Sequence, residues 1–154
     1  HNGWLFEKLR GAQLVYDARG VNFPSLLPGY FAAIAQCEAD LVVQVIEMME
    51  GLLAKAAAGQ INEEELARAK SNRINSEILS KQTNSAAATS AALDELYGFG
   101  FDWSKGHADR IMAVTLEEVK AVAHKHLSVP TTITVITSAP EILLKKSETQ
   151  PQPG

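Results

Sequence analysis

The sequence predicts an α+β fold, and three features of the residue pattern support this prediction. The stretches 14–21 and 30–37 read as strands separated by a loop rich in glycine and proline. Between residues 41 and 126, apolar residues recur at the spacing of helices. The stretch 131–138 then alternates threonine with isoleucine and valine, which is typical of a strand with one buried face.

The chain opens with a predicted amphipathic helix that runs into the first strand. Trp4 and Leu9 lie on one side of this helix, and charged residues lie on the other. Gly11 is expected to end the helix, because glycine adopts the left-handed conformation most easily. The first strand then begins at Leu14 and runs to Val21.

Arg10 and Tyr16 are the candidate functional residues at this junction. The helix end and the strand start place the cation and the phenol near one corner of the predicted sheet. Both side chains are donors that suit a peptide carbonyl or an oxyanion. A purely structural interpretation also stays open, in which Arg10 caps the helix and Tyr16 packs in a half-buried strand.

The second strand, 30–37, is apolar on both faces, so we expect helices to cover at least one of its faces. The short connection between the two strands favours an antiparallel pair. Asp40 is the predicted N-cap of a helix that starts at Leu41 and stops at Gly59.

Later helices carry start signals that are local in the sequence. Asn62 and Glu65 have the spacing of a capping box, as do Thr115 and Glu118. The remaining predicted caps are Thr83 or Asn84 for a helix ending near Gly98, and Asp102 for a short helix after it.

Composition excludes several classes of function. The 154 residues have a net charge of −4, and no cluster of basic residues forms a nucleic-acid footprint. The single Cys37 excludes an intrachain disulfide and a multi-cysteine metal site. No apolar run reaches the 18 or so residues of a membrane-spanning helix. Composition does not decide between a periplasmic and a cytoplasmic location in a bacterium.

Five short motifs occur in a characteristic order along the chain. They are LFEKLR at 5–10, LVY at 14–16, GYF at 29–31, INEEELARAK at 61–70 and AVTLEEV at 113–119. Together they resemble the second domain of pitrilysin/insulinase-type zinc peptidases, the group that includes the mitochondrial processing peptidase and its bacterial relatives. The resemblance covers nearly the whole chain, from residue 4 to about 140, although the turn between Arg10 and Tyr16 is one residue shorter than in the best-known members.

The resemblance implies a two-layer domain, with an antiparallel sheet and helices packed on one face. Residues 1–142 would form a C-terminal domain of one peptidase half, with the N-terminal part of that domain missing. Residues 143–154 are polar and proline-containing, so they are expected to be a disordered tail. In the family, the residues matching Arg10 and Tyr16 bind the substrate backbone, and the tyrosine helps to stabilise the tetrahedral intermediate.

The family binds zinc through an H-x-x-E-H motif and a distant glutamate. The four histidines of this chain, His1, His107, His124 and His126, do not form that motif. We therefore expect no metal ligands and no peptidase activity in this chain alone. The resemblance places zinc in an N-terminal domain or a partner subunit of a complete zinc metalloendopeptidase.

Two hypotheses for the function follow. In the first, the chain is the substrate-binding, transition-state-stabilising domain of a zinc peptidase, and its partners are a peptide substrate and the zinc-bearing domain or subunit. In the second, it is a non-catalytic structural or interaction domain of the same fold. In either case, a sheet that lacks some of its strands would expose an edge, through which the chain could form a homo-oligomer.

Overall fold

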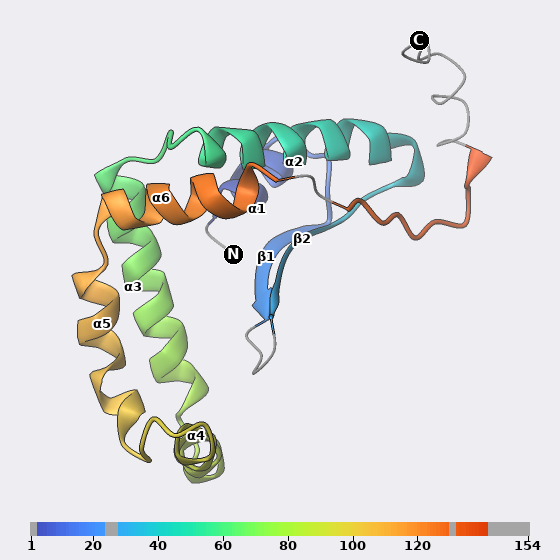
Figure 1. Ribbon diagram of the computed structural model, residues 1–154. Coiled ribbons are helices and arrows are strands. Elements are labelled where there is room, and N and C mark those ends of the chain that lie inside the picture. The colour runs from blue at the N-terminus through green and yellow to red at the C-terminus, as the bar shows by residue number, and fades with distance from the viewer. Residues whose placement is uncertain (1–2, 24–27, 130–131, 142–154) are drawn as a thin grey trace. The chain divides into compact units, whose positions relative to one another are not determined.

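The computed structural model describes residues 3–23, 28–129 and 132–141, and they fold as a mixture of helices and an antiparallel strand pair, as the sequence predicted (Figure 1). The chain divides into two compact units. Residues 1–57 and 127–154 make up the first unit, and residues 58–126 make up the second. None of the helices in the described ranges is long and apolar enough to cross a membrane.

The first unit is built around a two-stranded hairpin. Its elements, in chain order, are α1 (Trp4–Gly11), β1 (Asp17–Phe23), β2 (Tyr30–Gln36), the 3-10 turn η1 (Ala39–Leu41) and α2 (Val42–Ala57). The strands pair in an antiparallel register that sets Asp17 opposite Gln36 and Phe23 opposite Tyr30. The rings of Phe23 and Tyr30 stack at the far end of the hairpin, with centroids 5.3 Å apart.

The core of the first unit lies where α1 and α2 meet the start of the hairpin. Leu9 is fully buried there and makes the centre of a small apolar cluster. The other buried members are Leu14, Val15, Ala18 and Val45. Because burial of one such side chain contributes about 1.5–3 kcal/mol, this cluster fixes the end of α1 against the base of β1.

The second unit is helical in its described residues. Its elements are α3 (Glu63–Ser80), α4 (Asn84–Leu96), the 3-10 turn η2 (Trp103–Gly106), α5 (His107–Ala113) and α6 (Leu116–Leu127), of which the last residue belongs to the first unit. Helices α3 and α5 run side by side (Figure 1), and Nζ of Lys70 donates to the carbonyl oxygen of Met112 at 2.9 Å.

The predicted helix starts are confirmed where the bonds that make them are local. Asn62 accepts the Glu65 backbone N–H at 2.9 Å, and the Glu65 carboxylate accepts the Asn62 N–H at 3.0 Å. Thr115 and Glu118 form the same reciprocal pair. Thr83 caps α4 by accepting the backbone N–H of Ala86 at 3.2 Å.

A 3-10 turn precedes the α-helix at two further predicted caps: Asp40 is wrong, whereas Asp102 is the N-cap residue of its turn but makes no capping hydrogen bond. Helix α2 begins at Val42 after η1, so Asp40 lies inside that turn and not at the helix N-cap. Likewise, η2 precedes α5, and the side chain of Asp102 makes no capping hydrogen bond there. In each case the residues just before the α-helix form a 3-10 turn, so the predicted cap residue does not lie next to the first residue of the α-helix.

The predicted strands are only partly correct. The second strand, predicted at 30–37, is confirmed by β2, whereas the first begins at Asp17 and not at Leu14. The last predicted strand, 131–138, is not formed, because residues 132–138 belong to no strand. Residue 131 and the predicted tail at 143–154 lie outside the described residues.

Candidate functional site

The candidate site lies at the corner where α1 turns into β1, and Gln13 forms that corner. Gln13 has φ of 57°, the left-handed conformation that glycine usually supplies. Its N–H donates to the Arg10 carbonyl at 2.9 Å, and the Leu14 N–H donates to the Leu9 carbonyl at 3.0 Å. These two bonds make a Schellman motif, in which the buried Leu9 and Leu14 form the accompanying apolar contact.

This turn corrects the prediction for the end of the first helix. Gly11 is the last residue of α1, and the left-handed position falls two residues later, at Gln13. The motif uses Leu14 as its final residue, and Leu14 and Val15 are both buried. Leu14 is thus part of the turn, and the side chains of Leu14 and Val15 pack in the core. For this reason β1 starts only at Asp17.

Arg10 reaches over the turn toward the strand. Its Nη1 donates to the carbonyl oxygen of Val15 at 2.9 Å. The guanidinium has five N–H donors in a fixed plane, and this carbonyl is its one hydrogen-bond acceptor among the residues that the structure describes. Arg10 is an exposed residue, so the remaining donors face solvent and are available to a ligand.

Tyr16 lies at the entrance to the hairpin with 56% of its surface exposed. Its backbone N–H donates to the Gln36 carbonyl at 2.7 Å, which ties it to the start of the strand pair. Its hydroxyl donates to Oε1 of Glu38. This hydrogen bond, with the negative charges of Glu38 and Asp40, raises the pKa of the Tyr16 phenol above its usual value.

The structure brings Arg10 and Tyr16 to the same open pocket, which has a volume of about 320 Å³. Residues of the turn, with Glu38 and Leu41 from beyond β2, complete its wall. A cation and a neutral phenol on one pocket can both donate to a carbonyl oxygen, whereas the Glu38 carboxylate competes for the phenol. The pocket therefore contains two hydrogen-bond donors, Arg10 and Tyr16, and a carboxylate, Glu38, that already accepts the hydrogen bond of the Tyr16 hydroxyl.

Sequence reasoning missed Glu38. The residue follows β2, and no motif in the sequence marks it. The signal that would identify it is the hairpin register, because pairing of Asp17 with Gln36 brings the chain after Gln36 beside Tyr16. That register was not available from the sequence pattern alone.

Histidine and acidic residues do not assemble into a metal centre in the described part of the chain. In residues 3–23, 28–129 and 132–141, no group of three or more His, Cys, Asp or Glu side chains could hold a metal ion. His107 lies 3.9 Å from the Glu77 carboxylate, which also contacts Lys81 and Arg73. Two cations beside the carboxylate make this cluster an ion-pair network, and its donor set does not fit zinc.

Comparison with known proteins gives a similar solved structure and a family match to the first part of the chain. The structure is similar to the crystal structure of a proposed zinc protease from Bordetella pertussis Tohama I, with a TM-score of 0.52 and 19% sequence identity. The match covers 80% of this chain and 68% of that chain, and at this identity it shows the fold. No curated protein matches the sequence. Residues 1–73, slightly under half of the chain, match the family described as "Peptidase M16 inactive domain". This match and the shared fold support a pitrilysin-type M16 C-terminal domain.

Proposed function

We propose that this chain is the substrate-binding and transition-state-stabilising domain of a zinc-dependent peptidase. The observation that supports the proposal is the shared pocket of Arg10 and Tyr16, two donors on adjacent sides of one Schellman turn. Arg10 and Tyr16 lie in two of the five motifs that carry the family resemblance. The described residues of this chain offer no fitting metal-ligand set, so in this proposal the zinc belongs to another domain or to a partner subunit.

In the proposed reaction, Arg10 holds a carbonyl oxygen of the bound peptide through the guanidinium donors that do not contact Val15. Tyr16 donates a hydrogen bond from its hydroxyl group to the oxygen of the scissile carbonyl as negative charge develops there. For this step the hydroxyl must leave Glu38 and turn to the substrate. A donor that acts only as charge develops lowers the barrier and not the ground state.

Tyr16→Phe tests the proposed role of the hydroxyl, because the substitution keeps the ring and removes only the oxygen. In the complete peptidase, with its zinc-bearing domain or subunit present, we expect kcat to fall about 10²–10³-fold with KM nearly unchanged. Tyr97→Phe is the matched control, because Tyr97 lies at the end of α4 in the other unit. Metal content should be equal in all three proteins, and thermal unfolding should confirm that each of them is folded at the assay temperature.

Arg10→Lys tests the proposed substrate contact separately. Lysine keeps the charge and loses the planar fork, so we expect KM for peptides to rise about tenfold with a smaller change in kcat. Arg73→Lys, on the exposed face of α3, is the control. If Tyr16→Phe is as active as the wild type, Tyr16 has no catalytic role. If Arg10→Lys leaves KM unchanged, Arg10 does not contact the substrate.

A non-catalytic structural or interaction domain is the second candidate. Two observations favour it: the matching family is described as an inactive domain, and Glu38 already occupies the Tyr16 hydroxyl. This candidate predicts that Tyr16→Phe and Arg10→Lys leave turnover unchanged. Deleting the domain would then weaken assembly with the zinc-bearing part and alter activity only through that loss.

A further inference from the structure

The contact between Tyr16 and Glu38 joins two residues whose backbones are fixed. The Tyr16 N–H donates to the Gln36 carbonyl at 2.7 Å, so Tyr16 is tied to the end of β2. Glu38 has an extended backbone, and its carbonyl oxygen accepts the Leu41 N–H at 3.1 Å in η1. The hydrogen bond between the two side chains therefore changes by side-chain rotation, without a movement of the chain.

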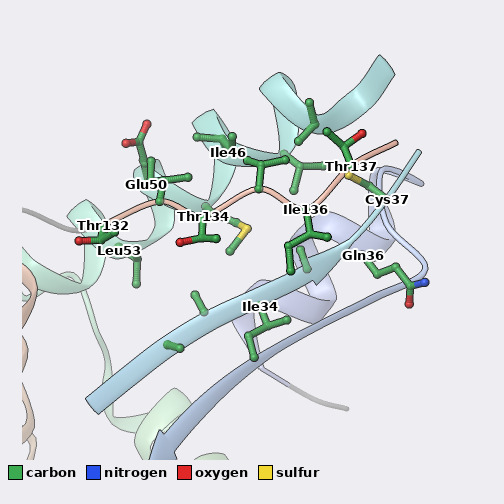
Figure 2. A pocket seen from close by; sticks show the side chains of 18 of the residues that line it. Ile34, Gln36, Cys37, Ile46, Glu50, Leu53, Thr132, Thr134, Ile136 and Thr137 are labelled. Atoms are coloured by element: carbon green, nitrogen blue, oxygen red, sulfur yellow. The ribbon is translucent and has the colours of Figure 1, made fainter. Parts of the chain in front are cut away.

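Strand geometry explains why the Glu38 side chain can reach Tyr16. In Figure 2 the Cys37 side chain points toward α2, whereas the Gln36 side chain points away from it. Successive residues of an extended segment point to opposite sides. Glu38 therefore lies on the same side of the chain as Gln36, and from there its carboxylate reaches the pocket that Arg10 and Tyr16 line.

Glu38 is a strong acceptor for the Tyr16 hydroxyl. Among the residues that the structure describes, this hydroxyl is the one donor that the Glu38 carboxylate contacts, and Arg10 donates to the Val15 carbonyl instead. A charged acceptor forms a stronger hydrogen bond than a neutral carbonyl does. The same bond is the main cause of the raised pKa of Tyr16, so the phenol is also a weaker donor toward other acceptors.

The chemistry of a hydroxyl makes Glu38 and the substrate compete. A hydroxyl has one proton to donate, so Tyr16 bonds strongly to one acceptor at a time. When a substrate oxygen takes that hydrogen bond, the Glu38 carboxylate is left facing the lone pairs of the phenol oxygen. The barrier to reaction then includes the loss of a charge-assisted hydrogen bond, which the substrate complex can still retain before the reaction.

We propose that Glu38 is a positioning residue that restrains Tyr16, because it holds the hydroxyl away from the substrate and thereby slows turnover. Glu38 acts only through Tyr16. This inference rests on the proposed function, since restraint of the hydroxyl affects turnover only if Tyr16 donates a hydrogen bond to the substrate.

Glu38→Gln in the complete peptidase, with its zinc-bearing domain or subunit present, tests the restraint. Glutamine has nearly the shape of glutamate, and its amide N–H can donate to the phenol oxygen, which leaves the Tyr16 proton for the substrate. With fluorescence-quenched peptides of mixed sequence as substrates, we expect kcat to rise about three- to tenfold with KM nearly unchanged. A side chain that served only to support the fold would lower kcat when it is replaced.

Asp40→Asn is the matched control for this substitution. The negative charge of Asp40 also raises the pKa of Tyr16, but the hydroxyl donates to Glu38 and not to Asp40. The control therefore removes a neighbouring charge and leaves the hydrogen bond in place. We expect its kcat to stay within about twofold of the wild type, because salt screens exposed charges. An increase as large as that in Glu38→Gln would assign the effect to charge alone and overturn the proposed competition.

A double substitution separates this inference from the proposed function. In a Tyr16→Phe background, Glu38→Gln should leave kcat unchanged, because no hydroxyl remains to be released. If Tyr16→Phe lowers kcat but Glu38→Gln does not raise it, or raises it equally without the hydroxyl, only the restraint by Glu38 is overturned. If Tyr16→Phe is as active as the wild type, the proposed function fails and this inference fails with it. Thermal unfolding confirms that each variant is folded at the assay temperature.

Discussion

The Tyr16 hydroxyl donates a hydrogen bond to the Glu38 carboxylate, although the two residues lie 22 positions apart in the chain. The hairpin makes this contact possible, because its register returns the chain to the side of Tyr16 immediately after Gln36. Glu38 therefore controls both the direction of the hydroxyl and the strength with which it holds its proton. The contact joins the motif-bearing turn to a residue that no motif marks.

Glu38→Gln should lower the pKa of the Tyr16 phenol toward its usual value. The hydrogen bond to the Glu38 carboxylate is the main cause of the raised pKa, and the negative charge of Glu38 adds to it. Glutamine accepts a weaker hydrogen bond than a carboxylate and carries no charge, so both causes are reduced. Because the folded-state pKa is raised, stability from this bond is present below about pH 10 and is lost as the pH rises through the folded pKa. Ring NMR signals can follow Tyr16 separately from Tyr30 and Tyr97. If the pKa of Tyr16 is the same in the wild type and in Glu38→Gln, Glu38 is not the cause of the raised pKa.

Gln13→Gly should stabilise the protein. The left-handed conformation at Gln13 costs an L-residue roughly 1–2 kcal/mol, part of which is offset because glycine is more flexible in the unfolded chain. We expect the free energy of unfolding to rise by about 0.5–1 kcal/mol, measured by urea denaturation.

The same substitution at a helical glutamine supplies the control for Gln13→Gly. Gln44 lies in α2, where glycine should lower the free energy of unfolding by up to about 1 kcal/mol. The two substitutions therefore have opposite expected signs. A loss of stability at both positions would mean that position 13 is not held in the left-handed conformation.

Glu77→Gln should destabilise the second unit in a pH-dependent manner. Lys81 lies 2.6 Å from the Glu77 carboxylate and Arg73 lies 3.4 Å from it, and the hydrogen bond from Lys81 is the main cause of a lowered Glu77 pKa. Because the folded-state pKa is depressed, this stabilisation is present above the unfolded pKa of about 4.3 and is lost as the pH falls through the folded value.

We expect Glu77→Gln to cost up to about 1 kcal/mol at pH 7, with the difference from wild type shrinking below about pH 4. Thermal unfolding across this pH range provides the measurement. Glu117→Gln is the control: its side chain is 84% exposed and its contact with Lys120 is 3.3 Å, so a change near zero is expected. A pH-independent loss in Glu77→Gln would point to packing and not to the ion pair.

The sequence by itself determined the features that depend on residues close together in the chain. The capping boxes at Asn62–Glu65 and Thr115–Glu118 were predicted correctly, because each is made of hydrogen bonds across three residues. The strand at 30–37 and the antiparallel pairing were also correct, since a short Gly/Pro-rich connection permits little else. The family resemblance rested on such local motifs, and the predicted helix end and strand start placed Arg10 and Tyr16 at one corner.

Tertiary structure decided the features that require a partner distant in the chain. β1 starts at Asp17 because the buried Leu14 and Val15 belong to the turn and the core, which alternation of residue types does not reveal. Glu38 reaches Tyr16 only through the strand register. The 132–138 segment has the sequence of a strand but is not one here, because a strand needs a neighbour for its hydrogen bonds. Hydrogen bonds between residues a few positions apart can be predicted from one stretch of sequence. Strand pairing cannot, because it depends on which other strand edge lies beside the segment in the folded protein.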